Sequence, residues 1–183
     1  MRLSSMLSAI CFCAAACGTD VGGANTPDAT PVGADEPAEL NGITKAHNDA
    51  RATVNVGPMT WDPALAQIAA DWAAKCTDSD HDGLLDHNAD RSKGYPTYVG
   101  ENIYASTGTA NGPDAVTDWV SESKDYDYAS NSCSGICGHY TQVVWKASVK
   151  LGCALHRCPG LKYSSTIVCD YAPGGNISGQ KPY

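Results

Sequence analysis

Residues 149–172 read VKLGCALHRCPGLKYSSTIVCDYA, and they contain the clearest structural pattern in the chain. Two runs rich in β-branched and aromatic residues, 149–158 and 163–172, are separated by the turn-forming residues PGLK. Such runs, bounded by Gly, Pro and Ser, predict two strands that pair as an antiparallel hairpin. A third run of similar composition, TQVVWKA at 141–147, predicts another strand just before the hairpin.

Helical patterns occupy the region before these strands. Within residues 39–56, apolar residues recur at helical spacing from Leu40 to Val54. Asp62 and Pro63 suit the N-cap and first position of a second helix, and Pro113 suits the start of a third. Because the helices come first and the strands follow, the order predicts an α+β fold rather than a parallel doubly wound sheet.

The composition divides the chain into three parts. Residues 1–16 carry Arg2 and then a short apolar run ending in small residues, which predicts a secretory signal peptide. Residues 17–38 are rich in Gly, Pro, Ala and Asp without an apolar period, which predicts a disordered linker. Residues 39–183 have the size and composition of one globular domain.

Cys17 offers a second interpretation of the amino-terminal segment. It follows three alanines and precedes Gly18, so it resembles the lipid-modified cysteine of a bacterial lipoprotein. Ala14 stands where such a signal usually has Leu, so plain cleavage remains an alternative. Both interpretations predict an exported protein, extracellular or in the cell envelope, whose membrane link would be a lipid on Cys17.

The net charge of the chain disfavours some classes of binding partner. The chain has 12 basic and 20 acidic residues and a formal net charge of −8. An acidic surface disfavours nucleic acid and anionic membranes as partners.

Six cysteines fall within residues 39–183, and their even number in an exported chain predicts three disulfides. Their spacing lacks the paired CxxC motifs of zinc ribbons. Two of them are close enough in sequence to close a local loop, and the other four can be joined in three ways. A hairpin centred near Leu161 favours one of these ways, because it places two cysteines opposite each other. The favoured pairs are Cys133–Cys137, Cys153–Cys169 and Cys76–Cys158.

Several motifs in sequence order resemble the CAP superfamily of cysteine-rich secretory proteins, antigen 5 and plant pathogenesis-related proteins. The motifs that carry this resemblance are HNDAR (47–51), WDPALA (61–66), GEN (100–102), CGHYTQVVW (137–145), LGCA (151–154) and VCDYAPGGN (168–176). The resemblance covers essentially the whole domain. It implies a three-layer α-β-α sandwich with a central antiparallel sheet, stapled by disulfides.

The resemblance also implies a cleft lined by His87, Glu101, Glu122 and His139. Two imidazoles with water suit zinc or a similar divalent ion, so His87 and His139 are the expected metal ligands. The glutamates can orient the imidazoles or activate a bound water. His81 competes with His87 for the first position, but it falls in the segment DSDHDGLL, which aligns as an insertion.

That insertion resembles the first part of a calcium loop. Four aspartates and a glycine fit positions 1, 3, 5, 9 and 6 of such a loop, whereas Ala89 replaces the closing Glu at position 12. An acidic turn held by its own side chains is an equal alternative. The possible calcium ligands are Asp78, Asp80, Asp82 and Asp86.

These features favour an extracellular binding module for a lipid-like, sterol-like or other small ligand, with zinc in the cleft. One alternative is a metal-dependent hydrolase, peptidase-like, that uses Glu101 or Glu122 as its general base. The other is a disulfide scaffold that displays loops to an extracellular protein partner. Binding is favoured over catalysis, and no GxSxG motif supports a serine hydrolase.

Overall fold

The computed structural model describes residues 35–183. The predicted signal peptide, Cys17 and most of the predicted linker lie outside the described residues, so the lipid anchor stays a prediction. Glu36, near the end of that linker, accepts hydrogen bonds from the backbone N–H groups of Gly42 (2.8 Å) and Thr44 (2.7 Å). Within residues 35–183, no helix is both long and apolar enough to cross a bilayer.

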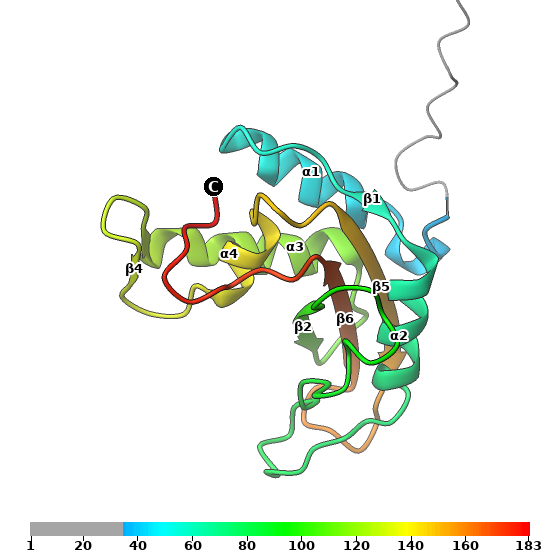
Figure 1. The fold of residues 1–183 in the computed structure, drawn as a ribbon. Helices are drawn as coiled ribbons and strands as arrows, with labels where there is room; N and C mark the ends of the chain where they lie inside the picture. Colours follow the sequence, from blue (N-terminus) through cyan, green and yellow to red (C-terminus); the bar gives the residue numbers. More distant parts are fainter. Residues whose placement is uncertain (1–34) are drawn as a thin grey trace, which may run out of the picture.

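A four-stranded sheet with the order β1-β5-β6-β2 forms the centre of the molecule (Figure 1). The predicted hairpin is confirmed, because β5 and β6 pair antiparallel with Cys153 opposite Cys169. The edge strand β2 is antiparallel to β6, whereas the short β1 runs parallel to β5. The strands are β1 (Thr60–Trp61), β2 (Gly100–Ser106), β5 (Lys150–Arg157) and β6 (Ser165–Ala172).

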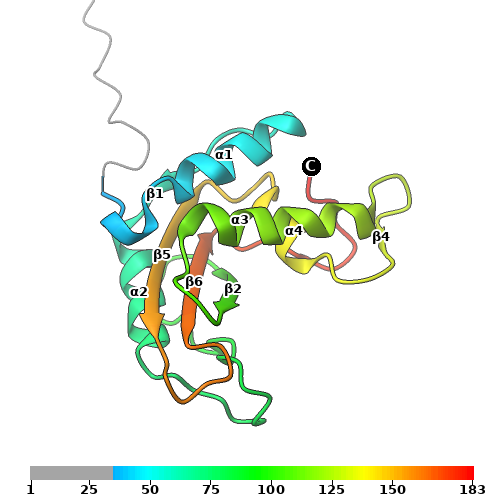
Figure 2. The same cartoon turned by 180° about the vertical axis from the view of Figure 1, so that it is seen from behind.

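Helices cover both faces of the sheet, which confirms the three-layer α-β-α sandwich. One face packs Leu151, Ile167 and Tyr171 against α1, α3 and α4, and the other packs Val168 against α2. Seen from opposite sides in Figures 1 and 2, α2 and α3 lie on opposite faces of the sheet. The helices are η1 (Ala38–Leu40), α1 (Ile43–Thr53), α2 (Pro63–Ala73), α3 (Gly112–Ser121), η2 (Glu122–Asp125) and α4 (Gly138–Val143), and a small second sheet pairs β3 (Tyr126–Asp127) with β4 (Ser132–Cys133).

The predicted helix starts are confirmed. Asp62 precedes α2, and its Oδ1 accepts hydrogen bonds from the backbone N–H groups of Ala64 (2.9 Å) and Leu65 (3.2 Å). Pro63 takes the first position, where its missing N–H costs nothing. Asn111 caps α3 in the same way by accepting a hydrogen bond from Asp114 N (3.0 Å).

The strand predicted at 141–147 is wrong, because its first residues belong to helix α4. The backbone N–H groups of His139 and Tyr140 donate to Oε2 of Glu122 at 3.0 and 3.1 Å. At the other end, the Arg51 guanidinium donates to the carbonyls of Val143 and Trp145, both at 2.9 Å. These long-range bonds satisfy both helix ends and outweigh the strand propensity of the run.

Three disulfides join the described elements, and their pairs are those that the hairpin favours. Cys76–Cys158 ties the segment after α2 to the residue after β5. Cys133–Cys137 closes the turn that leads into α4, and Cys153–Cys169 bridges β5 and β6.

Candidate functional site

The first half of the site is a His–Glu pair on the α2 side of the sheet. His87 lies in the segment between α2 and β2, and Glu101 is the second residue of β2. The His87 Nδ1 lies 2.6 Å from Glu101 Oε1, which also accepts a hydrogen bond from Asn88 N at 2.9 Å. The His87 side chain is 57% exposed and the Glu101 side chain 0%, so a buried carboxylate orients an accessible imidazole.

The second half is a matching pair on the helical side. The Nδ1 of His139, at the start of α4, lies 2.6 Å from Oε1 of Glu122 in η2. The Trp119 ring stacks against the His139 ring, with centroids 6.2 Å apart and an interplanar angle of 19°. Because Glu122 also binds the first N–H groups of α4, one carboxylate fixes both the helix and its imidazole.

The two halves meet at a cavity of about 240 Å³. His87, Glu101 and His139 line it, whereas Glu122 supports His139 from outside the lining. Since a glutamate engages Nδ1 of each imidazole, Nε2 is the nitrogen left to each histidine for a ligand. The other lining residues are Asn102, Ile136, Gly138 and Asn176.

A larger groove of about 510 Å³ shares both histidines with this cavity. Its apolar lining comes mainly from β2 and from the insertion at 78–85, and Tyr104 and Tyr163 add aromatic rings. Four aspartates also line it, and none of them forms a salt bridge within residues 35–183. The aspartates are Asp80, Asp82, Asp86 and, in α3, Asp118.

Three of the four possible calcium ligands lie together, two in the insertion and one at the residue that follows it. Asp78, Asp80 and Asp86 can place carboxylate oxygens within 4.8 Å of one another. Asp82 is outside this group, and its Oδ1 accepts a hydrogen bond from Leu84 N at 2.8 Å. One oxygen of Asp78 accepts a hydrogen bond from Gly83 N at 3.1 Å, whereas the other is buried and has no hydrogen-bond partner in the described part of the chain. The loop thus combines side-chain-capped turns with one unsatisfied ligand atom.

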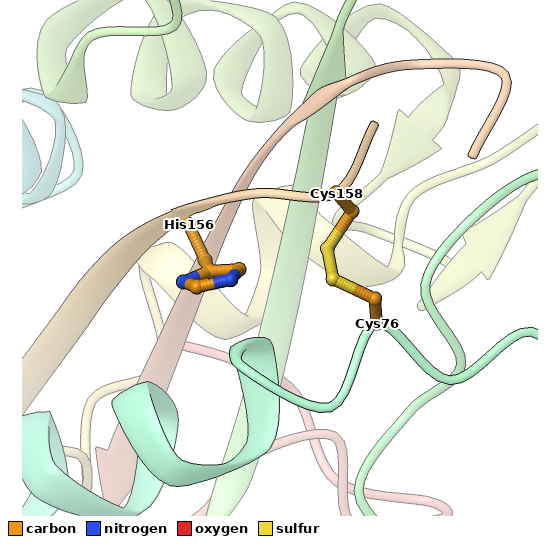
Figure 3. A group of neighbouring side chains, drawn as sticks. All are labelled: Cys76, His156 and Cys158. Carbon is orange, nitrogen blue, oxygen red and sulfur yellow. A yellow bond between two sulfur atoms is a disulfide. The ribbon is translucent and has the colours of Figure 1, made fainter. Parts of the chain in front are cut away.

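A second cluster of possible metal ligands consists of Cys76, His156 and Cys158. Figure 3 shows the His156 imidazole beside the bond that joins the two sulfur atoms. A disulfide sulfur is not a thiolate, and zinc sites with cysteine use thiolates. Cys76 and Cys158 therefore contribute to stability and leave His156 without metal-binding partners in this cluster.

His47, in helix α1, is a structural residue. Its Nδ1 lies 2.8 Å from the Ile43 carbonyl oxygen and its Nε2 2.9 Å from the Tyr171 hydroxyl. The side chain is fully buried, and this burial lowers the pKa of His47 to about 4. Both nitrogens are occupied, so His47 adds no ligand to the cleft.

Two supporting residues of the site were missed at the sequence level. Asn102 is buried and donates a hydrogen bond through Nδ2 to the His139 carbonyl oxygen at 3.1 Å. Arg51 is fully buried and holds the end of α4 through the carbonyls described above. Both lie in motifs of the family resemblance, GEN and HNDAR, but their partners are more than 30 residues away in the chain.

Comparisons with known proteins identify the family of this domain. The model of the CAP cysteine-rich secretory protein family matches residues 44–171. Pathogenesis-related protein 1 of Arabidopsis thaliana is 46% identical over 139 residues, which cover 75% of this chain and 78% of that protein. GLIPR1-like protein 1 of Homo sapiens is 39% identical over 161 residues, and the match covers 81% of this chain and 64% of that protein.

Solved structures resemble the same domain. The venom allergen-like protein 4 of Schistosoma mansoni superposes with a TM-score of 0.66 at 26% identity, covering 80% of this chain and 94% of that one. NaASP2, solved with Zn²⁺, has a TM-score of 0.61 at 25% identity and covers 77% of this chain and 82% of that one.

Proposed function

Because this chain belongs to the CAP family of cysteine-rich secretory proteins, we propose that it is an extracellular module that binds a divalent metal and a small ligand. His87 and His139 would hold the metal, and the ligand would lie in the adjoining groove. The observation that carries this proposal is the pair of 2.6 Å His–Glu contacts, which leave Nε2 of each imidazole available. The three disulfides fit an extracellular protein.

The donor set fits zinc. Neutral imidazoles are common zinc ligands, and a carboxylate on the far nitrogen fixes the tautomer and raises the ligand's basicity. No third His, Cys, Asp or Glu atom groups with these imidazoles within residues 35–183, so water or the ligand would complete the coordination. The relative NaASP2 was solved with Zn²⁺, which supports this choice of metal. Bound zinc would supply a positive charge for a ligand oxygen.

The groove suggests the kind of ligand. Apolar atoms of Leu85 and Ile103 would contact a hydrocarbon body. Asp118, which forms no salt bridge within residues 35–183, would favour a cationic or hydrogen-bond-donating group. A small amphipathic molecule with a lipid-like or sterol-like body and such a polar end would use both features.

The positions of the glutamates support binding over hydrolysis. The Glu101 side chain is fully buried, and its Oε1 contacts His87 Nδ1 and Asn88 N. Glu122 accepts two backbone N–H groups in addition to its contact with His139. A general base needs a free oxygen within reach of the attacking water. These contacts occupy Oε1 of Glu101 and both oxygens of Glu122, and Oε2 of Glu101 is buried. Metal-dependent turnover of a peptide or ester library that is lost in E101Q and E122Q would favour the hydrolase instead.

Zinc titration of the purified protein by calorimetry tests the proposal. We expect one zinc per chain, with at least tenfold weaker binding in H87A and in H139A because each removes one imidazole ligand. H81A is the matched control, because His81 is exposed and does not line the cavity. Zinc binding that is the same in wild type, H87A and H139A would overturn the metal site. If every other measured interaction were also unchanged, the scaffold alternative would be favoured.

We further propose that the insertion and the adjoining Asp86 bind calcium through the carboxylates of Asp78, Asp80 and Asp86. The unsatisfied oxygen of Asp78 supports this, because a buried carboxylate oxygen without a partner is costly. Calcium should raise the thermal unfolding midpoint of the wild type but not that of D78N. D90N is the control, since Asp90 is exposed and outside the cluster. A midpoint that calcium leaves unchanged in the wild type would contradict this assignment.

A further inference from the structure

Asp170, in the central strand β6, is a buried carboxyl group to which the proposed function assigns no role. The residue is 0% exposed. In the sheet it lies directly opposite Glu101 of β2 on one side and Gly152 of β5 on the other. Within residues 35–183, neither of its carboxyl oxygens has a hydrogen-bond partner, and the same holds for Oε2 of the fully buried Glu101 side chain. Three buried oxygens without partners therefore belong to two residues that lie opposite each other.

Residues directly opposite in an antiparallel pair have Cβ atoms about 5 Å apart and point to the same face. Two ionised carboxylates at that separation, both removed from water, repel each other strongly. A single proton held by one of the two carboxyls removes the repulsion. It also provides the missing donor, because a protonated carboxyl has one O–H.

The contacts of the pair indicate which residue holds the proton. Glu101 already accepts hydrogen bonds from His87 and Asn88 through Oε1, so it acts as an acceptor in this network. Asp170 accepts none. Burial and, to a smaller extent, the charge of Glu101 raise the pKa of Asp170 to about 8, against a smaller opposing effect of Arg91. Asp170 is therefore the protonated partner at neutral pH.

The other neighbours of Asp170 within residues 35–183 do not change the conclusion that Asp170 holds the proton. On the β5 side, Gly152 has no side chain, and the first turn of α2 packs so closely on it that a Cβ would lie 2.1 Å from Ala66 N. The carboxylate of Asp62 at that turn is neutralised by Lys150, at 2.7 Å. Tyr171, next in sequence, stays neutral because burial raises its pKa well above the usual value.

We propose that Asp170 is a positioning residue whose carboxyl proton is donated to Oε2 of Glu101, so that Glu101 stays the acceptor that orients His87. The bond holds His87 with its proton on Nδ1 and leaves Nε2 free toward the cavity. This inference concerns the ligand-free protein and does not require the metal or the ligand proposed above. A failure of zinc binding would therefore leave it standing.

The pH dependence of stability tests whether Asp170 holds the proton. Its pKa is about 8 in the folded state and about 4 in the unfolded state. The folded protein therefore holds an extra proton between these values, and the stability from Asp170 declines as pH rises from about 4 to about 8. We expect the unfolding midpoint of D170N to rise relative to that of the wild type as pH increases over this interval. Above it, the difference between the two midpoints should stay constant.

D118N is the matched control, because Asp118 is exposed and forms no salt bridge within the described residues. Its midpoint should run parallel to that of the wild type at every pH. His47 also titrates, but it is present in all three proteins and cancels in the differences. A D170N midpoint that runs parallel to the wild type from pH 5 to pH 9 would overturn the proposal.

Nitrogen NMR of the His87 imidazole tests the positioning itself. D170N retains an N–H donor for Glu101, so His87 should keep the Nδ1–H tautomer of the wild type. D170V removes the donor, so we expect a mixture of tautomers. An unchanged His87 spectrum in D170V would show that Asp170 does not position it. Should D170V not fold, carboxyl carbon NMR of the wild type at pH 6 serves instead, because it must show a protonated Asp resonance that D170N lacks.

Discussion

The two halves of the cleft hold the same His–Glu contact in different ways. On the sheet side, an exposed His87 is oriented by Glu101, whose side chain is fully buried beside Asp170. On the helical side, His139 is 31% exposed and lies against Trp119, and its partner Glu122 also caps helix α4. Both contacts measure 2.6 Å.

The difference shows where each half derives its rigidity. The sheet half depends on buried charge and a shared proton, so pH should affect it most. The helical half depends on backbone hydrogen bonds at the two ends of a six-residue helix, so loss of those bonds should affect it most. Short helices have little stability of their own, which makes α4 dependent on Glu122 and Arg51.

Removal of a disulfide should produce the largest difference in stability between the two halves. Cys76–Cys158 closes a separation of 82 residues beside the segment that carries His87, whereas Cys133–Cys137 closes one of 4 residues before His139. By loop-closure entropy, the double variant C76S/C158S should lose about 4 kcal/mol of unfolding free energy and C133S/C137S about 2 kcal/mol. Urea unfolding measures both losses. Equal losses would contradict the expectation that the disulfide closing the longer loop stabilises the protein more.

Removal of the Arg51 side chain should affect the helical half. Its guanidinium donates to four carbonyls, those of Gly57, Val143, Trp145 and Ser148. R51M leaves these carbonyls without that donor and should cost on the order of 3 kcal/mol in urea unfolding. The exposed Arg157 supplies the control, and R157M should unfold like the wild type. A loss in R51M below about 1 kcal/mol would show that α4 does not need this support.

His47 offers a pH test on the face of the sheet opposite to Asp170. Its folded pKa of about 4 lies below its unfolded pKa of about 6.5, so its contribution to stability is present above pH 6.5 and is lost as pH falls toward 4. The sign is thus opposite to that of Asp170. H47Q should remove a pH-dependent change of roughly 3 kcal/mol, visible in unfolding midpoints between pH 4 and pH 7. An unchanged slope in H47Q would show that His47 is protonated in the folded state.

The smallest expected difference concerns the two glutamates. E122Q removes the negative charge at the start of α4 and should cost about 1 kcal/mol in thermal or urea unfolding. E101Q removes one of two buried carboxyl groups that lie opposite each other. The free energy of unfolding of E101Q should therefore fall by less than that of E122Q, or should rise. Zinc binding should weaken at least tenfold in both variants, because each imidazole loses its orienting carboxylate. A larger stability loss in E101Q than in E122Q would contradict the claim that the carboxylate of Glu122 stabilises the fold more than that of Glu101.

Local chemistry explains what could be predicted from the sequence. The Asp62–Pro63 helix start and the hairpin at 149–172 depend on residues close in the chain, and the structure contains both. The hairpin register also accounts for Cys153–Cys169. Strand β2 was missed because GENIYAS contains polar and small residues and depends on pairing with β6.

Distant contacts explain the rest. The run TQVV has strand propensity but forms a helix, because Glu122 and Arg51 hold its ends from other elements. The positions of His87 and His139 follow from the family resemblance, whereas their contacts with Glu101 and Glu122 required the structure. Asp170 was overlooked because it is a single acidic residue within a strand-forming run and depends on Glu101 for its role.

One measurement tests most directly whether the two halves form a single metal site. Zinc would be titrated into the labelled wild-type protein while nitrogen NMR follows Nε2 of His87 and Nε2 of His139. A shared ion should shift both resonances along one saturation curve that ends at one zinc per chain. If the two resonances saturated at different zinc concentrations, or only one responded, the halves would not form one site.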